Sequence, residues 1–354
     1  MDHVNLSAYL PLMLSIYDES PQIAAENVRI ARELTALADV LPLPLVRAFG
    51  ATRTTVDLYR RTKKKSTLGK REKKIFDWLG RAPRAFLVAA VHCEIELDMR
   101  PLIVSDESGR QVVLGERDTI EYYRSVLSEA LAHDMHHLVV AANIAAPCGL
   151  EAGEGVIVMG DEFARTTESL ISNLWAVVEL SNTTGWSPVR SLPLASVLDW
   201  TTRYQLSTRM GDSAISRAYN ALTYLFDSPP SDDPLELFWA LMGVEALFSE
   251  GALGVMDQVV RRSQLLIGRH DSFKKKFGRA YSVRSSFVHG GMPFPGKFTS
   301  NYGAFDFDKF KSKVHGASTV AAYLLVRALQ ELVVNNWSAL QFELTLTGRD
   351  LVPS

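Results

Sequence analysis

The sequence predicts an α+β protein in which a mixed α/β N-terminal region precedes an all-helical C-terminal bundle. Between residues 84 and 160, short apolar runs with alternating polarity stand among turn-forming residues, which is typical of strands. From about residue 196 onward, apolar residues recur at helical spacing, and Gly or Pro residues separate the segments. We therefore expect three regions, which cover residues 1–82, 83–200 and 205–345.

Composition and cysteine content indicate the class of protein. The chain has 354 residues, of which 47% are hydrophobic and 22% are charged, as in ordinary globular proteins with a sizeable core. Its two cysteines, Cys93 and Cys148, have no C-x-x-C spacing, which argues against a disulfide scaffold or a Cys-rich zinc site. Asp2 stands where a signal peptide needs positive charge, and no apolar run reaches the roughly twenty residues of a membrane span. We expect a cytoplasmic protein that does not cross a membrane.

Residues 1–82 are predicted to be mainly helical. Ser20 and Pro21 form a good N-cap and first-turn pair. Apolar residues then recur at helical spacing, at Ile23, Val28, Ala31, Leu34, Leu37 and Leu41. A basic stretch follows at 60–84, with eleven Lys and Arg residues against Glu72 and Asp77. A solvated linker and an arm that contacts phosphate groups both fit this stretch.

Residues 83–200 are predicted to mix strands and helices. The alternation of Cys93, Ile95 and Leu97 indicates a strand, in which His92 is a satisfied buried or half-buried side chain. A turn at 106–109 between two apolar runs predicts a hairpin. Asp118 is expected to cap a long helix, and residues 153–160 (GEGVIVMG) read as another strand. We expect this region to sense a trigger or to restrain the bundle.

The C-terminal bundle is predicted from four or five helical segments with short breaks. One segment starts at Asp233-Pro234 and ends at Gly251, and the next ends at Gly268. Two more cover about 271–289 and 306–336, and a short tail follows from Trp337.

The segment YSVRSSFVHGG at 281–291 carries the chemistry that the sequence suggests most strongly. Gly290 and Gly291 supply a helix stop, so His289 lies in the last turn, where unpaired carbonyls favour the imidazolium. Ser285 precedes His289 by four residues and is expected to orient its ring. A guanidinium such as that of Arg284 binds phosphate through two hydrogen bonds, and an imidazole moves protons near neutral pH. Together they supply the minimum for cleaving RNA with its own 2′-hydroxyl as the nucleophile.

Three segments in order, GVEALFSEG, RRSQLLIG and YSVRSSFVHGG, resemble the HEPN superfamily and most closely its Apea-like branch. The resemblance covers about residues 205–345 and includes the R-x4-H motif at the end of a bundle helix. It implies a metal-independent endoribonuclease that works as a homodimer with one composite cleft. A toxin or anti-phage defence effector, with a regulatory protein partner, is the biological setting that it suggests.

The resemblance also implies individual roles. Arg284 would hold the scissile phosphate, and His289 would be the general acid or base. Ser285 stands where many active members have Asn, Asp or His. Glu245 and Arg262 match an acidic and a basic residue of the two preceding helices, and they are expected to pair and set the bundle geometry.

A row of basic residues lies upstream on the same helix. Its members are Lys274, Lys275, Lys276 and Arg279. These side chains are expected to bind RNA beside the cleft, although an ordinary solvated helix face has the same composition.

Other candidate sites are weaker. His133 and His137 have the four-residue spacing by which one helix face ligates zinc, with His136 and Asp134 between them. Since a third ligand is not evident, we read a polar helix face and predict neither a metal nor a cofactor. His315 belongs to a second VHG triplet, but Phe310 stands where the Arg should be, so His315 is treated as incidental. The alternative to a ribonuclease is a non-catalytic module for dimerisation or for binding RNA or a partner.

Overall fold

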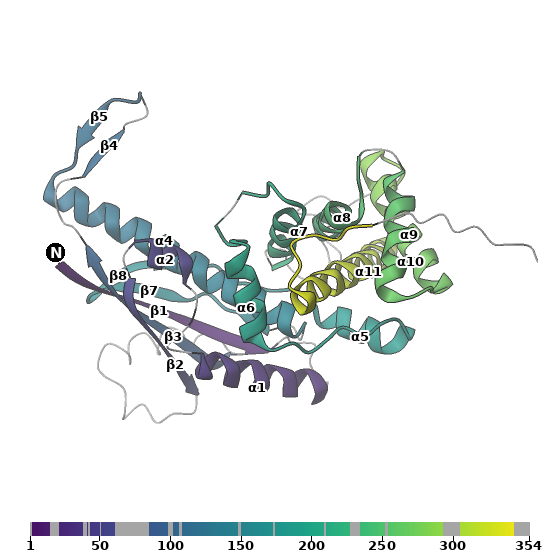
Figure 1. Cartoon of the computed structure of the whole chain (residues 1–354), viewed down its shortest axis with the longest axis horizontal. Helices are drawn as coiled ribbons and strands as arrows, with labels where there is room; N and C mark the ends of the chain where they lie inside the picture. Colours follow the sequence, from purple (N-terminus) through teal and green to yellow (C-terminus); the bar gives the residue numbers. More distant parts are fainter. Residues whose placement is uncertain are drawn as a thin grey trace, which may run out of the picture.

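The protein is an α+β fold with an N-terminal sheet and C-terminal helices, seen in the computed structural model of the chain (Figure 1). The described residues are 2–14, 21–37, 41, 43–49, 51–60, 85–97, 102–105, 108–147, 150–172, 174–208, 210–226, 234–251, 254–292 and 305–342. Several residues used in the sequence analysis lie outside this set, namely Ser20, residues 61–84, residues 106 and 107, Cys148 and Asp233.

The main sheet is antiparallel and has the strand order β2-β3-β1-β7-β8, with β6 paired to the end of β1. Its strands are β1 (Asp2–Leu14), β2 (Ala51–Arg60), β3 (Ala85–Leu97), β6 (Leu150–Ala152), β7 (Val156–Met159) and β8 (Glu162–Thr166). The long strand β1 lies in the middle and pairs with β3 in a register that opposes Leu6 to Cys93 and Leu10 to Ala89. The sheet therefore joins residues from both sides of the boundary expected at 82/83.

Helices cover one face of this sheet. They are α1 (Pro21–Ala36), α2 (Pro44–Ala48) and the long α4 (Glu116–Ala145). Because side chains alternate along a strand, Leu6, Ala8, Leu10 and Leu12 all enter the core on that face. Tyr9 joins Val88, Ala90, Val156 and Val158 in a smaller cluster on the opposite face.

A buried carboxylate connects α4 to α2. Asp134 accepts hydrogen bonds from the backbone amides of Leu45 (3.3 Å) and Val46 (3.0 Å), two of the unpaired donors at the start of α2. Burial raises the pKa of Asp134 to about 6, because the loss of hydration outweighs these two hydrogen bonds.

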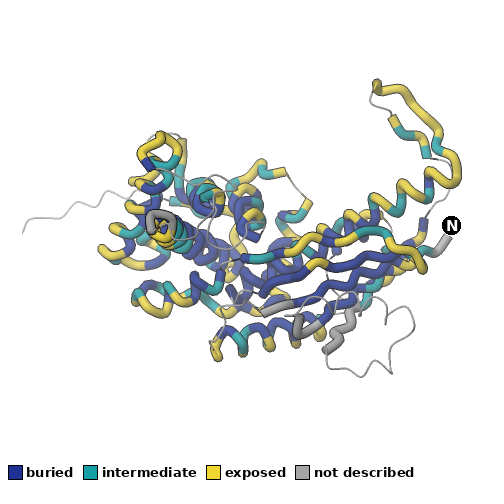
Figure 2. The backbone as a smooth tube through the Cα atoms, turned by 180° about the vertical axis from the view of Figure 1, so that it is seen from behind, coloured by how far each residue is buried: buried dark blue, intermediate teal, exposed yellow. Residues whose placement is uncertain are grey.

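A separate hairpin projects from the fold. Strands β4 (Ile103–Ser105) and β5 (Gln111–Val113) pair with each other and stand away from the main sheet, beyond the start of α4 (Figure 1). Figure 2 shows most of this hairpin as exposed, and its apolar residues Ile103, Val112 and Val113 are among the exposed ones.

The C-terminal half is a set of helices around α11. The set consists of α5 (Leu174–Thr184), α6 (Leu194–Arg203), α7 (Ala214–Thr223), the short 3-10 helix η3 (Tyr224–Phe226), α8 (Pro234–Phe248), α9 (Val255–Ile267), α10 (Asp271–Val288) and α11 (Phe305–Asn335). Helix α11 contacts α5, α7, α8 and α10. By length and composition it could cross a membrane, but 83% of its most apolar window is buried inside the fold. A helix in the core of a fold can have the same length and apolar composition.

Several predictions for the first 200 residues are confirmed, and others are wrong. The strand at 93–97, the hairpin, the long helix and the strand within 153–160 are all present. The expectation that residues 1–82 are mainly helical is wrong, because β1 and β2 are long strands. Gly115, rather than Asp118, occupies the N-cap of α4, and Val28 is exposed on α1. His92 is satisfied as expected, since its Nδ1 lies 2.9 Å from the Ser7 hydroxyl.

Candidate functional site

Helix α10 positions the Arg–His motif at its C-terminal end. Phe273, Phe277, Ala280 and Val283 form its buried face. His289 is the C-cap residue, and its backbone amide donates to the carbonyl of Ser285 over 3.0 Å. Gly290 follows with φ +71°, a left-handed conformation that suits glycine and ends the helix. The predicted helix stop is therefore confirmed.

Arg284 is held by two neighbours on α8. Its Nη1 lies 3.4 Å from Oε1 of Glu245, and its guanidinium lies over the ring of Phe238, 5.9 Å from the centroid. The hydroxyl of Tyr281 donates to the same Glu245 oxygen over 2.9 Å. Burial, and then the charge of Glu245, raise the pKa of Tyr281, so this hydroxyl stays protonated. Arg284 remains partly exposed.

The expected pair between Glu245 and Arg262 is not formed. Arg262 instead lies 3.3 Å from the carboxylate of Glu250 and donates to the carbonyl of Phe248 over 2.9 Å. It also lies over the ring of Phe342, 4.9 Å from the centroid. Arg262 thus satisfies a carbonyl at the end of α8 and fixes the C-terminal tail, because α9 presents it to the end of α8 rather than to its middle.

His289 and Ser285 are both exposed. Within the described part of the chain, the Ser285 hydroxyl makes no hydrogen bond to the His289 ring, so the expected orienting contact is not present. His289 follows Arg284 by five positions, which places them about 140° apart around the helix axis. No hydrogen bond or ion pair joins these two side chains among the described residues. Within one chain, Arg284 and His289 therefore lie at the same end of α10 but on different sides of the helix.

The expected basic row divides between two surfaces. Lys276 and Arg279 line a groove of about 670 Å³ between α5, α10 and α11, together with Lys313 and His315 of α11. Lys274 and Lys275 are exposed and do not line it. Lys276, Arg279 and Lys313 form no ion pair with any residue that the structure describes. Three cations therefore border one groove.

The groove reaches the last turns of α10. Ser282 and Ser286 also line it, and Ser286 precedes His289 by three residues, on the same side of the helix. The groove thus reaches the side of α10 that carries His289, although His289 does not line it, whereas Arg284 faces α8.

His315 has a place in this groove that the sequence analysis missed. Its ring is stacked on Trp175 with a centroid distance of 6.5 Å, and burial lowers the pKa of the imidazole. The R-x4-H pattern gives no signal for His315, because Phe310 stands where the Arg would be. Its position on α11 relative to α10 depends on helix packing, which no local pattern encodes.

The histidines of α4 are arranged as packing residues. The Nδ1 of His137 lies 2.9 Å from the Tyr219 hydroxyl, and the two rings stack. Burial lowers the pKa of both His136 and His137 to about 4, whereas His133 is exposed. In the described ranges, no group of three or more His, Cys, Asp or Glu side chains could hold a metal ion.

Comparison of the chain with protein-family models, with curated proteins and with solved structures found no match. The resemblance to the HEPN superfamily therefore depends on the three sequence segments and on the residues discussed above.

Proposed function

We propose that this protein is a metal-independent endoribonuclease of the HEPN type, in which Arg284 binds the scissile phosphate and His289 transfers protons. The observation that carries the proposal is the end of α10. There an exposed imidazole and a partly exposed guanidinium lie within two helical turns, and Glu245 and Tyr281 hold the guanidinium in a defined place.

A homodimer resolves the separation of the two side chains. Arg284 and His289 of one chain point about 140° apart. A single phosphate group therefore contacts an Arg284 and a His289 most readily when it lies between the α10 helices of two protomers. Helix α8 is apolar all round, which is typical of a buried helix, yet it leaves Leu235 and Met242 exposed beside Arg284. Val288 of α10 is also exposed, and it follows Arg284 by four positions, on the same side of the helix. A second copy packed on this surface would cover these side chains.

The groove lined by Lys276, Arg279 and Lys313 supplies a path for the RNA backbone. Phosphate groups bind unpaired cations, and the released counterions make such binding strongly dependent on salt. The groove ends at Ser286, three residues before His289, so a strand lying in it would be extended past this residue to meet the proposed cleft.

The chemistry that these groups support is transesterification. The 2′-hydroxyl loses its proton to one His289 imidazole and attacks the adjacent phosphorus, forming the P–O2′ bond. The P–O5′ bond breaks, and a protonated His289 from the second protomer supplies a proton to the leaving 5′-oxygen. Arg284 stabilises the charge that develops on the phosphoryl oxygens. The products are a 2′,3′-cyclic phosphate and a 5′-hydroxyl.

RNA cleavage in EDTA tests this proposal directly. We expect Arg284→Ala and His289→Ala to lower the cleavage rate by at least about 100-fold, the range for loss of one acid–base or charge-stabilising group. His133→Ala and Arg203→Ala are matched controls, because both side chains are exposed and lie on other helices. Equal cleavage by all variants, or cleavage by none, would remove the proposal.

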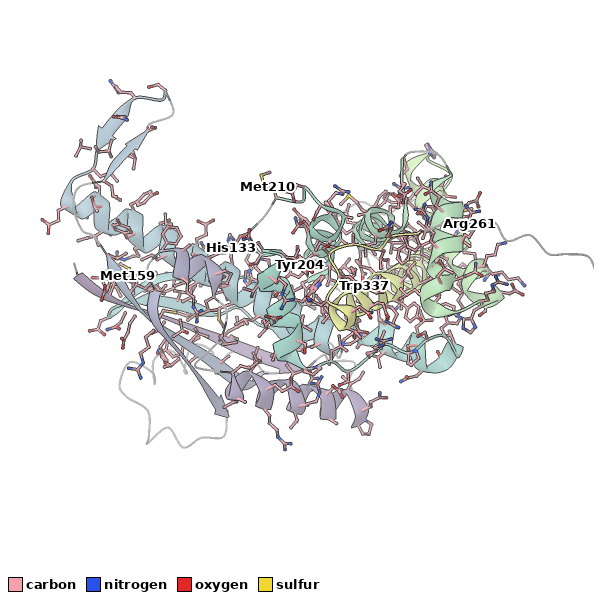
Figure 3. The ribbon with its side chains drawn as sticks, in the orientation of Figure 1. His133, Met159, Tyr204, Met210, Arg261 and Trp337 are labelled. Carbon is pink, nitrogen blue, oxygen red and sulfur yellow. The ribbon has the colours of Figure 1, made fainter. Side chains whose placement is uncertain are left out.

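A second experiment tests the dimer surface. Met242→Glu places a charge on the exposed side of α8 and is expected to yield monomers in sedimentation equilibrium with loss of cleavage. Met210→Glu is the control, since Met210 is 92% exposed and lies outside α8 and α10 (Figure 3). Wild-type chain that is monomeric at micromolar concentration would contradict a dimeric enzyme.

A non-catalytic interaction module is the second candidate, and the pairing of Arg284 with Glu245 and Phe238 favours it. In that case Arg284 and His289 serve as structural contacts. Thermal melts separate the two candidates, because a structural His289 would cost several kcal/mol on removal and a catalytic one in an open cleft would cost about nothing.

A further inference from the structure

Arg327 is a permanent cation inside the fold with incomplete hydrogen bonding. Its side chain is only 2% exposed on α11. Its Nη2 lies 3.2 Å from Glu331 and 3.5 Å from the Ser187 hydroxyl. Among the residues that the structure describes, its Nε and Nη1 atoms have no hydrogen-bond partner. Leaving buried donors of a charged group unpaired is unfavourable, so this arrangement calls for a further acceptor.

The carboxylate of Glu331 forms ion pairs with two arginines, Arg327 and Arg190. Arg190 lies 3.0 Å from the same Glu331 oxygen that Arg327 approaches. Gln330 holds the backbone of Arg190, accepting from its amide and donating to its carbonyl, both over 2.7 Å. The three ionised groups therefore carry a net charge of about +1 in a fixed geometry. Burial lowers the pKa of Arg327, and the neighbouring charge of Arg190 lowers it further.

These groups line a pocket of about 670 Å³. The rest of its wall is largely apolar and includes Leu265 and Leu266 of α9 and, from the C-terminal tail, Trp337, Leu340 and Phe342. Figure 3 shows Trp337 at the end of α11, beside Tyr204. The volume falls within the range of small-molecule sites, which combine apolar walls with a few fixed polar groups.

We propose that this pocket binds a small organic anion, whose carboxylate or phosphate group bonds to Arg327 and Arg190 and whose apolar body lies against Leu266 and Trp337. The guanidinium fork suits either head group, because both accept two parallel hydrogen bonds. The site lies apart from Arg284 and His289, so its existence does not depend on RNA cleavage.

Calorimetric titration of the full chain tests the site with three probes: phenyl phosphate, benzoate and benzyl alcohol. At least one of the two anions is expected to bind saturably, and the tighter one identifies the head group. Benzyl alcohol is expected not to bind. Binding of benzyl alcohol as tight as that of the anions, or no binding of either anion at millimolar concentration, would overturn the proposal.

Charge variants at an exposed position test it without risk to folding. Leu265 is 78% exposed at the rim of the pocket. Leu265→Lys is expected to strengthen anion binding by about two- to fivefold, and Leu265→Glu to weaken it similarly, as single surface charges do. Met210→Lys and Met210→Glu are the controls and should leave the affinity unchanged. Equal responses at both positions would show nonspecific charge attraction and overturn the site.

Substitutions of Arg190 and Glu331 inside the pocket should change the anion affinity in opposite directions. Arg190→Gln should weaken anion binding at least about tenfold through the loss of a charged hydrogen bond. Glu331→Gln should strengthen it, because the competing carboxylate is removed while the shape is kept. Arg203→Gln and Asp199→Asn, which alter an exposed ion pair on α6, are the matched controls. If Glu331→Gln folds but binds the anion more weakly than the wild type, the proposed orientation of charge is wrong.

Discussion

Arg284 of α10 and Glu245 of α8 form an ion pair with an Nη1–Oε1 distance of 3.4 Å. The hydroxyl of Tyr281 donates to the same oxygen, so three side chains meet at one point between the two helices. The guanidinium keeps further donors for a ligand, because it has five N–H groups and the described residues engage only one of them. Any phosphate group that binds Arg284 must nevertheless compete with Glu245.

The first prediction concerns this competition between Glu245 and a phosphate group for Arg284. Glu245→Gln should tighten RNA binding severalfold, since the amide keeps an acceptor for Tyr281 but no longer neutralises Arg284. The free energy of unfolding should change by no more than about 1 kcal/mol, as is usual for a partly exposed pair. Fluorescence anisotropy with labelled RNA and urea unfolding measure the two quantities. Glu250→Gln, which removes the partner of Arg262, is the control, and weaker RNA binding by Glu245→Gln would contradict the prediction.

The second prediction concerns acid stability. His136 and His137 have pKa values near 4 in the folded protein, below the ordinary value of 6.5, so the unfolded chain binds more protons between these values. Their contribution is present above about pH 6.5 and is lost as the pH falls toward 4, by up to about 3 kcal/mol for each histidine. Urea unfolding from pH 7 to pH 4 should show this loss. His136→Gln should reduce it, whereas His133→Ala should not.

Asp134 acts in the opposite direction. Its folded pKa of about 6 exceeds the ordinary value of 3.8, so the folded state binds more protons in this interval and gains stability as the pH falls from about 6 to 4. Asp134→Asn removes this gain, so the acid loss due to the histidines should become steeper in the variant. An unchanged pH profile in Asp134→Asn would show that this carboxyl titrates normally.

Two glycines in the C-terminal helices give a matched pair of substitutions. A Cβ atom at Gly243 would lie 2.9 Å from both terminal methyl carbons of Leu325 and 3.1 Å from the Cβ of Ala221. Gly243→Ala should therefore lower the free energy of unfolding by about 1–3 kcal/mol through overpacking. At Gly316 of α11 a Cβ meets no atom within 4 Å, so Gly316→Ala should stabilise the protein by up to about 1 kcal/mol. Thermal denaturation decides both, and a stabilising Gly243→Ala would contradict the close packing of α8 on α11.

The projecting hairpin should contribute little to stability. Ile103 and Val113 are exposed, so Ile103→Ser with Val113→Ser should change the free energy of unfolding by less than about 0.5 kcal/mol. Leu6→Ala in the centre of the sheet is the comparison and should cost about 2–5 kcal/mol, because Leu6 is fully buried. A large loss in the hairpin variant would indicate that the hairpin packs against the rest of the protein.

Sequence periodicity was informative where one face of an element is polar. The strand with Cys93, Ile95 and Leu97 and the helix stop at Gly290 follow directly from local patterns. The expectation of helix in residues 2–14 is wrong because residues 8–14 (AYLPLML) form an unbroken apolar run, which does not distinguish a strand from a helix. Pairing with β3 along its length makes this segment a strand, and that partner lies about 80 residues away in the chain.

The sequence by itself determined the order of elements in the C-terminal half, the end of α10 and the presence of Arg284, Ser285 and His289 there, because spacing and glycine conformation act within a few residues. Only the tertiary structure decided that Glu245 meets Arg284 instead of Arg262, that Lys276 and Arg279 share a groove with Lys313, and that Arg327 is buried beside Arg190. These contacts depend on the rotation and separation of packed helices. Such quantities arise from the fit of many distant side chains at once, so no short segment specifies them.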